Sequence, residues 1–346
     1  MTSSAAATDP LLDIRGLTIG FTDVDRTEVT LLRGVDIQVR RGEIVALVGE
    51  SGCGKTLTTR AVLGLLQSPP LEVTAGTIRF DGVDLLGLGA DAIHALRGRA
   101  MTLVPQHPLS SLNPVFTVGE QFFDLLSFQG RASIGPLGYL RPRLDRTARD
   151  RNRAATIAAL KSVSLPDPEG VIDRYPSELS GGMCQRVLIA MALLSTPKLI
   201  IADEPGTALD VTIEAQINRL LLAKVREQRT AMLYITHDLG IARELSDRVF
   251  VMYAGRVVET GATAQVFARP RHPYTRGLID SVPRLSAAPI KGIRGVLPDP
   301  KTLGEGCAFR FRCDFAVPAC SAATPPLAAV APAQAAACPR SAEIAL

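Results

Sequence analysis

The sequence predicts an α/β fold in which strands alternate with helices around a largely parallel sheet. The run Glu43–Val48 is almost entirely apolar, which is the composition of a strand that is buried on both faces. Further short apolar runs recur along the chain, and helical patterns separate several of them. These runs are Leu11–Phe21, Val35–Val39, Ala100–Val104, Leu199–Ala202, Ala231–Thr236 and Arg248–Met252.

The composition is that of a globular protein. Of 346 residues, 47% are hydrophobic and 21% are charged, and the net charge of +4 is too small to indicate a nucleic-acid partner. Met1–Pro10 has neither a basic stretch nor an apolar core, and no apolar run reaches the roughly 18 residues that a membrane helix needs. We therefore expect a cytosolic protein whose six cysteines are thiols or metal ligands.

The pattern changes twice along the chain. Helical periodicity dominates residues 107–197, which predicts a helical subdomain, and its Gly/Pro/Arg-rich segment Gly130–Arg143 resembles a surface insertion. From residue 261 to residue 346 the chain is rich in proline and holds four of the six cysteines. We therefore expect a main domain over residues 1–260, followed by a small cysteine-containing extension over residues 261–346.

A glycine-rich segment follows the buried strand. Gly49–Thr56 fits G-x-x-x-x-G-K-[ST], and the helical pattern Thr56–Leu66 comes next. Glycines allow backbone N–H groups to surround phosphates, and the helix N-terminus adds partial positive charge. Lys55 would reach the β- and γ-phosphates, and Thr56 would ligate Mg²⁺. A chance glycine-rich turn is the alternative, but the strand–turn–helix context favours a nucleotide site formed by Gly49, Ser51, Gly52, Cys53, Gly54, Lys55 and Thr56.

Two adjacent acids end a second apolar strand. Leu199–Ala202 runs into Asp203 and Glu204, which places their carboxylates at the edge of the sheet where phosphates bind. We assign Asp203 to Mg²⁺ and Glu204 to the general base that activates water. A solvated acid at a strand end is the alternative, but Pro205 directly after both acids indicates a fixed turn.

The segment Leu179–Arg186 reads Leu-Ser-Gly-Gly-Met-Cys-Gln-Arg and opens an apolar helix. Ser180 is a good N-cap, and Gly181 and Gly182 expose backbone N–H groups behind it. Taken alone, this would be an ordinary capped helix. Together with the two phosphate-site motifs, however, the segment resembles the signature motif of ABC-type ATPases. Their fold is a RecA-like core with a helical subdomain.

That resemblance extends from residue 11 to about residue 260 and implies further site residues. Gln106 stands at the family's Gln loop, with a catalytic and Mg²⁺-binding role. Asp210 falls in the D-loop, and His237 resembles the switch histidine that senses the γ-phosphate. Phe21 matches the aromatic residue that stacks on adenine, although a buried strand aromatic explains it almost as well.

Two segments resemble the oligopeptide/dipeptide importers within this family: Ser111–Gln121 and Arg271–Thr275. The resemblance implies ATP binding together with a second ATPase subunit, which we expect to be a different chain, because the signature helix of one subunit caps the nucleotide of the other. It also implies two integral membrane permease subunits, an extracytoplasmic substrate-binding protein and a peripheral position on the cytoplasmic face of the inner membrane. Gly206 and Cys184 depart from the group, which usually has Thr and Arg at these positions.

Four cysteines mark the extension: Cys307, Cys313, Cys320 and Cys338. They lack the paired C-x-x-C knuckles of a zinc ribbon, and three close ligands with one remote ligand suit a [4Fe–4S] cluster better. The importer resemblance points the same way, because Gly306-Cys307 and Arg312-Cys313 match its C-terminal part. Zn²⁺ and unligated thiols are the alternatives, and we expect a structural role.

The sequence therefore predicts the ATP-hydrolysing subunit of a peptide importer. An importer of nickel or another small solute is one alternative, because the permease and binding protein select the cargo. A non-transport ABC ATPase acting on nucleic acid or the ribosome is a second alternative, and an iron–sulfur sensor that merely binds ATP is a third. The modest charge argues against the second alternative, and the complete set of hydrolytic motifs argues against the third.

Overall fold

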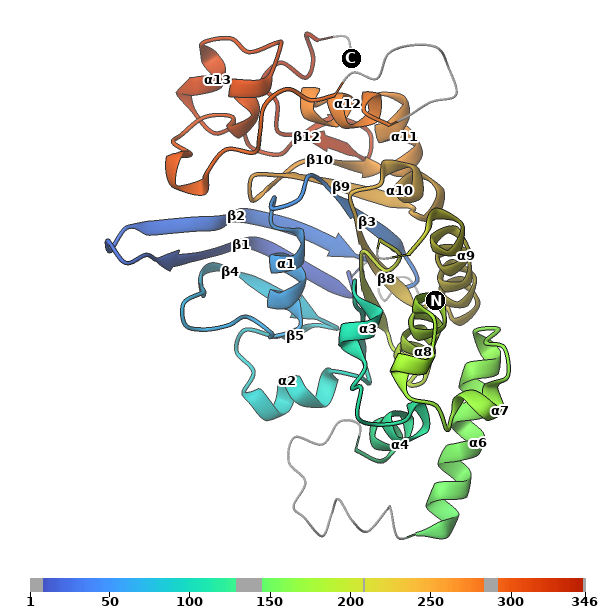
Figure 1. Cartoon of the computed structure of the whole chain (residues 1–346). Helices are drawn as coiled ribbons and strands as arrows, with labels where there is room; N and C mark the ends of the chain where they lie inside the picture. Colours follow the sequence, from blue (N-terminus) through green and yellow to red (C-terminus); the bar gives the residue numbers. More distant parts are fainter. Residues whose placement is uncertain (1–8, 129–144, 208, 283–291, 345–346) are drawn as a thin grey trace, which may run out of the picture. The chain divides into compact units, whose positions relative to one another are not determined.

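A computed structural model describes residues 9–128, 145–207, 209–282 and 292–344 (Figure 1). The predicted insertion Gly130–Arg143 lies outside these residues. The chain forms two compact units, one of Met1–Leu86 with Leu233–Leu346 and one of Gly87–Met232. They are called unit 1 and unit 2 below, and each is described by itself. Within the described residues, no helix combines the length and the apolar character needed to cross a membrane.

Unit 1 contains an antiparallel sheet, and its strand β1 (Leu12–Thr22) confirms the predicted run Leu11–Phe21, although the antiparallel pairing was not predicted. Its strand order is β2-β1-β4-β5, and its strands are β1 (Leu12–Thr22), β2 (Glu28–Val39), β4 (Glu72–Phe80) and β5 (Val83–Asp84). The predicted run Val35–Val39 is only the end of β2. The rest of β2 was missed because charged residues and Gly34 interrupt its apolar pattern.

The second sheet of unit 1 carries the predicted buried strand. Its strand order is β11-β12-β10-β9-β3-β8. The strands are β3 (Ile44–Val48), β8 (Ala231–Thr236), β9 (Arg248–Tyr253), β10 (Arg256–Ala262), β11 (Ala328–Ala331) and β12 (Gln334–Ala336). All residues of β3 and β8 are buried, and β3 pairs in parallel with β9. The predicted strands at these three places are confirmed.

Short helices complete unit 1 (Figure 1). They are α1 (Lys55–Val62), α10 (Leu239–Leu245), α11 (Thr263–Ala268), α12 (Pro273–Asp280) and α13 (Ala319–Ala322), together with the 3-10 turns η2 (Pro300–Thr302) and η3 (Ala308–Arg312). The predicted helix after the glycine-rich segment is α1, and it ends four residues earlier than expected, at Val62.

Unit 2 contains a parallel pair of strands and most of the long helices. The pair is β6 (Met101–Val104) with β7 (Leu199–Asp203), and Met101 lies opposite Leu199. The remaining elements are α2 (Ala90–Leu96), α3 (Pro108–Ser111), α4 (Val118–Phe128), α6 (Arg146–Ser162), α7 (Pro168–Val171), the 3-10 turn η1 (Pro176–Glu178), α8 (Gly181–Leu193) and α9 (Val211–Gln228). The described residues between β6 and β7 are thus helices and loops.

The cysteine-containing extension is built into unit 1. Strand β12 pairs with β10, and the Gln334 side chain donates a hydrogen bond to Glu259 on β10 at 2.8 Å. The Glu259 carboxylate also accepts the backbone N–H groups of Arg271 and His272 at 2.7 and 2.9 Å. Burial raises the pKa of Glu259, and these hydrogen bonds offset part of that increase.

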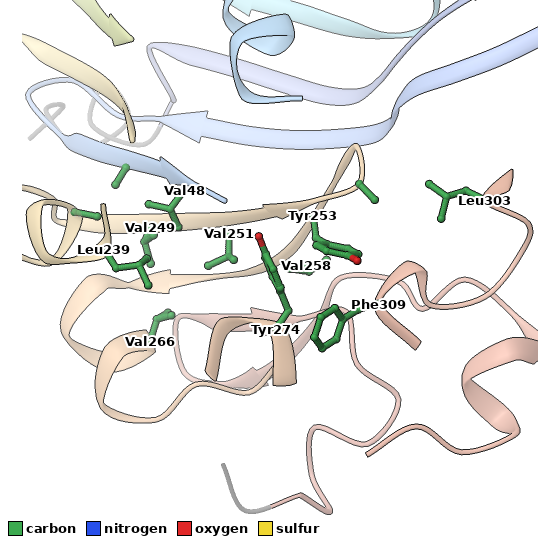
Figure 2. Packing of buried hydrophobic residues seen from close by; sticks show 13 residues of the cluster. Val48, Leu239, Val249, Val251, Tyr253, Val258, Val266, Tyr274, Leu303 and Phe309 are labelled. Carbon is green, nitrogen blue, oxygen red and sulfur yellow. The ribbon is translucent and has the colours of Figure 1, made fainter. Parts of the chain in front are cut away.

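Aromatic side chains fill the space between β9, α12 and η3. Figure 2 shows the rings of Tyr253, Tyr274 and Phe309 next to one another, with Val251 and Val258 beside them. The ring centroids of Tyr253 and Tyr274 lie 4.6 Å apart, and each lies 5.3 Å from that of Phe309. Aromatic pairs at such distances add stability beyond the area they bury. They fix the extension against the strand that pairs with β3.

Candidate nucleotide-binding site

The glycine-rich segment Gly49–Thr56 forms the loop between β3 and α1. At Gly49 a Cβ atom would lie 2.2 Å from the backbone oxygen of Met252, so no side chain fits there. Gly54 has φ 111° and is the N-cap of α1, and a Cβ there would lie 2.5 Å from the Leu32 side chain. The loop can therefore pack closely against β2 and β9 only with glycine at these two positions.

The predicted phosphate-binding lysine lies across this loop. The Nζ atom of Lys55 donates hydrogen bonds to the backbone oxygens of Gly49 at 2.7 Å and Glu50 at 3.1 Å. Lys55 is 5% exposed, so its positive charge is held inside the loop. In contrast, Ser51, Gly52 and Thr56 are exposed, which leaves the other side of the loop open to a phosphate chain.

Cys53 is a buried member of the loop. Burial raises the pKa of its thiol, so the side chain is a neutral thiol at neutral pH. Its backbone oxygen accepts the N–H group of Gly255 at 2.9 Å. Cys53 therefore acts as a small buried side chain whose backbone fixes the loop against the turn after β9.

Unit 2 brings two of the predicted catalytic residues together. Gln106 follows β6 and Glu204 follows β7, and because these strands are parallel, both residues lie at the same edge. The Gln106 Nε2 atom donates a hydrogen bond to the Glu204 carboxylate at 3.1 Å. Glu204 has φ 46°, a left-handed conformation that is uncommon for a residue other than glycine and that often marks functional sites.

Thr207 is a further residue at this edge, and sequence reasoning missed it. Its hydroxyl donates to the same Glu204 oxygen at 3.2 Å. The signal that could have found it is its position one turn beyond Glu204, within reach of that carboxylate. Asp203 is the last residue of β7 and is partly buried. The edge therefore presents one acid at the strand end and a second acid that accepts hydrogen bonds from Gln106 and Thr207.

The predicted signature segment begins α8. The Ser180 hydroxyl accepts the Met183 N–H group at 3.3 Å, which makes Ser180 the N-cap. A Cβ on Gly181 would lie 3.0 Å from the Leu209 side chain, and a Cβ on Gly182 would lie 2.9 Å from that of Ile213. The two glycines therefore allow close packing against the segment that contains Asp210.

Asp210, Cys184 and His237 each have a clear local position. Asp210 is the N-cap of α9 and accepts the Ile213 N–H group at 3.3 Å. Cys184 is buried in α8, and its sulfur lies 3.6 Å from the backbone oxygen of Pro176. His237 follows β8 and is exposed.

Phe21 lies near the end of β1, paired with Val29 on β2, and is half-buried. The predicted site residues are thus divided between the two units. Phe21, the Gly49–Thr56 loop and His237 belong to unit 1, whereas Gln106, Asp203, Glu204, Asp210 and the α8 N-terminus belong to unit 2.

The four cysteines of the extension line one pocket together with His272. The residues are Cys307, Cys313, Cys320 and Cys338, and all are free thiols. Burial and the neighbouring thiols raise the pKa of Cys313 to about 11. Within the ranges that the structure describes, no three or more His, Cys, Asp or Glu side chains are arranged to hold one metal ion.

Comparison with known proteins decides the family. Residues 32–207 match the family model for the ABC transporter, and residues 258–320 match that for the oligopeptide/dipeptide transporter C-terminal region. The chain belongs to the ABC transporter family. This ABC ATPase is 44% identical over 326 residues to a putative peptide import ATP-binding protein of Brucella ovis, a match that covers 90% of this chain and 92% of that protein.

The names of two further relatives specify a class of transported peptide. The ABC ATPase is 40% identical over 313 residues to the dipeptide transport ATP-binding protein DppD of Haemophilus influenzae, covering 90% of this chain and 89% of that one. It is 39% identical over 310 residues to the oligopeptide transport ATP-binding protein OppD of Bacillus subtilis, covering 89% and 82%. The chain is therefore an ATPase of the peptide-importer group.

Solved structures agree on the fold. A dimeric bacterial ABC transporter cassette matches with a TM-score of 0.60 and 25% identity, covering 73% of this chain and 98% of that chain. The structure of cbiO1 from Clostridium perfringens, part of an ABC transporter complex, matches with a TM-score of 0.59 and 29% identity, covering 75% and 91%. The expectation of an ABC-type nucleotide-binding fold is confirmed.

Proposed function

We propose that this chain hydrolyses ATP to drive the uptake of dipeptides or oligopeptides. The observation that carries the hydrolytic part is the hydrogen bond from Gln106 to Glu204 at 3.1 Å, at the shared edge of two parallel strands. It fixes the direction of a carboxylate that is close to the last residue of β7, as a water-activating base requires. The peptide-import names of the relatives support the substrate class.

The proposed mechanism assigns each residue a separate task. Lys55, Ser51 and the loop N–H groups hold the phosphates, and Phe21 stacks on the adenine. Thr56, Gln106 and Asp203 would hold Mg²⁺, which neutralises phosphate charge. Glu204 takes a proton from the attacking water. The oxygen of that water bonds to the γ-phosphorus while the bond between the γ-phosphorus and the β–γ bridging oxygen breaks, and ADP leaves with that oxygen. His237 contacts the γ-phosphate.

The assembly we propose contains a second ATPase subunit of a different sequence. In it, Ser180, Gly181, Gly182 and Asp210 of this chain contact the nucleotide that the partner subunit holds. Helix α8 supports this assignment, because its Ser180-capped N-terminus offers backbone N–H groups to an anion. Two permease subunits and an extracytoplasmic binding protein complete the importer, and this chain binds at the cytoplasmic face of the membrane.

The assignment of the base is tested by Glu204→Gln in the purified transporter. The variant keeps the side-chain shape but cannot accept the proton, so ATP binding should persist while turnover falls by about 10²-fold or more. Glu244→Gln, an exposed glutamate on α10, is the matched control and should hydrolyse ATP normally. Near-normal hydrolysis by Glu204→Gln would refute the assignment.

The substrate class is tested by transport in the reconstituted complex. ATP-dependent uptake is measured separately for labelled peptides of graded length and for Ni²⁺ as a comparison solute. Uptake of peptides of two or more residues supports the proposal. Uptake of Ni²⁺ without peptide uptake would replace it with the small-solute alternative.

We also propose that the four cysteines hold a [4Fe–4S] cluster with a structural role. Three cysteines close together in sequence with one remote cysteine, and no paired C-x-x-C knuckles, favour a cluster over a zinc ribbon. A [4Fe–4S] cluster is held by four cysteine thiolates. The donor set of four free thiols lining one pocket suits that chemistry.

The cluster is tested by anaerobic purification. Wild-type protein should be brown and contain about four irons per chain, and Cys313→Ser should lose both properties. Cys184→Ser, a buried cysteine of α8, is the control that should keep the colour. A colourless wild-type protein with one zinc per chain would overturn this assignment.

A further inference from the structure

The first residue after Gly49 in the phosphate loop is held from the C-terminal extension. The Glu50 carboxylate accepts two hydrogen bonds from the Arg312 guanidinium, at 2.7 and 2.9 Å. The Glu50 backbone N–H group donates to the Tyr274 hydroxyl at 2.9 Å. Bidentate arginine–carboxylate pairs are among the strongest side-chain interactions. Arg312 is 7% exposed and Glu50 is 26% exposed at the side chain, so solvent screens this pair only partly.

Further contacts hold the Arg312 guanidinium in this position. Its Nε atom donates to the backbone oxygen of Arg294 at 2.6 Å, and Nη2 also contacts that of Gly295 at 3.3 Å. The rings of Tyr253 and Phe309 lie 5.8 and 6.0 Å from its central carbon. The contact to Glu50 is therefore preorganised rather than a mobile surface ion pair.

Glu50 passes this restraint on to the phosphate-binding lysine. Its backbone oxygen accepts Lys55 Nζ at 3.1 Å and the Cys53 N–H group at 3.3 Å. The N–H, the carbonyl and the carboxylate of Glu50 are thus all engaged. A shift of this peptide would move the groups that set the direction of Lys55 and the curvature of the loop.

The two residues that hold Glu50, Arg312 and Tyr274, are each adjacent in sequence or by hydrogen bond to residues that line the four-cysteine pocket. Arg312 is the last residue of η3, which starts after Cys307 and ends before Cys313, so ligation of both cysteines fixes both ends of the turn. His272 lines the same pocket, and its Nδ1 atom accepts the Tyr274 N–H group at 3.1 Å. One route from the pocket to Glu50 therefore passes through η3, and the other passes through the start of α12.

We propose that Arg312 and Tyr274 are positioning residues for the phosphate loop, and that the group held by the four cysteines sets the ATP affinity through them. The second half of this statement rests on the proposed cysteine-bound group, whereas the first half does not. The extension then does more than stabilise the fold. Its ordered state is required for the loop to bind ATP at full affinity.

The first experiment breaks the Arg312 contact in the purified transporter. Arg312→Gln removes the charge and the bidentate pair, so KM for ATP should rise about tenfold, because hydrogen bonds to charged groups contribute about that factor or more. Because Gln106 and Glu204 are untouched, kcat should change by less than about threefold. Iron content should stay the same, which separates this effect from loss of the extension.

The controls are matched within the same unit. Arg294→Gln removes an 86%-exposed side chain that pairs only loosely with Asp314 at 3.7 Å, and it should leave KM and kcat unchanged. Arg312→Lys keeps the charge without the fork and should give an intermediate KM. Glu50→Gln combined with Arg312→Gln should be no worse than either change alone, because both remove one shared interaction. An unchanged KM in Arg312→Gln with normal iron content would overturn the proposal.

The second experiment asks whether the cysteine-bound group acts through the same contact. Cys313→Ser should raise KM for ATP in the wild-type background but should add little in the Arg312→Gln background. If wild-type protein is colourless and iron-free, the cluster proposal fails while the Arg312 measurement still decides the positioning role. If the chromophore is present but Cys313→Ser binds ATP with wild-type KM, the cluster stands and the coupling to the loop is rejected.

Discussion

The phosphate loop and the four-cysteine pocket reach their geometry by opposite routes. The loop is encoded in eight consecutive residues, Gly49–Thr56, and its conformation follows from glycines that sit where no Cβ fits. The pocket is lined by residues from His272 to Ile344, and it depends on contacts of β10, β12 and α12 that come from distant parts of the sequence. The turns of the loop backbone are therefore specified locally, and the extension adds only the restraint on Glu50. The pocket, in contrast, depends on several distant supports at once.

The largest effect is expected from a change inside the loop. In Gly49→Ala the new Cβ would lie 2.2 Å from the Met252 backbone oxygen and 2.8 Å from the Cys53 sulfur. Because backbone must shift to make room, we expect a loss of about 3 kcal/mol in unfolding free energy and loss of measurable ATP binding. Thermal unfolding and nucleotide titration of the transporter measure the two quantities.

A glycine without neighbours provides the control for this change. Among the residues that the structure describes, none other than the chain neighbours of Gly87 has an atom within 4 Å of a Cβ added there, so Gly87→Ala should keep both stability and ATP binding. Because the pocket is built from other residues, the four cysteines of the extension should stay protected from thiol reagents in Gly49→Ala. Normal ATP binding by Gly49→Ala would show that the loop tolerates a side chain and would contradict this account of its geometry.

The next largest effect is expected from a support of the pocket. Glu259→Ala leaves the buried N–H groups of Arg271 and His272 and the amide of Gln334 without their acceptor. Unsatisfied groups cost about 1 kcal/mol each at the lower end of the range. The lower end applies because the Arg271 N–H bond is only part-buried and the Gln334 amide keeps its bond to the Arg269 backbone oxygen, so we expect about 2–3 kcal/mol of lost stability. The reactivity of the extension cysteines toward a thiol reagent should rise at the same time, which Gly49→Ala should not cause.

The same residue makes the stability depend on pH. Burial raises the pKa of Glu259 above its ordinary value of 4.5, so the folded state binds the proton more tightly than the unfolded state. Its contribution to stability is therefore present below about pH 4.5 and is lost as pH rises through the folded pKa. Glu259→Gln does not titrate, so wild-type stability relative to this variant should fall as pH rises above 4.5. A constant difference across that window would contradict the raised pKa.

What the sequence could predict follows the same division between local and assembled features. The strands β1, β3, β6, β7, β8 and β9 were predicted because each is a predominantly apolar run. Strands β11 and β12 were missed because their alanine-rich sequence has little strand propensity and forms strands only by pairing next to β10. Glu50 and Arg312 are 262 positions apart, and no spacing rule connects them. The hydrogen bond from Gln106 to Glu204 was predictable only in part. The parallel strand order predicts that both residues lie at one edge, but it does not predict that they are in contact.

A smaller effect is expected at the edge of β6 and β7, where Glu204 lies. Thr207→Ala removes one hydrogen-bond donor to the Glu204 carboxylate and leaves the Gln106 bond at 3.1 Å. We expect kcat to fall about threefold to tenfold, which corresponds to one neutral hydrogen-bond donor to a carboxylate, and KM for ATP to stay the same. Thr207→Ser retains the hydroxyl and should hydrolyse ATP at nearly the wild-type rate. Equal kcat in Thr207→Ala and wild type would show that the Thr207 hydroxyl is not needed to orient the base.

The smallest effect is expected where this chain departs from its group, at Gly206. A Cβ at this position would lie 2.5 Å from Cγ of Glu214 on α9. The obstacle is thus a flexible side chain rather than backbone, which is the reverse of the situation at Gly49. A side chain shifts more easily than backbone, so Gly206→Ala should lower the unfolding free energy by about 1 kcal/mol, less than Gly49→Ala does. Thermal unfolding and kcat measure the outcome, and a loss as large as that of Gly49→Ala would show that the turn after Glu204 is as constrained as the phosphate loop.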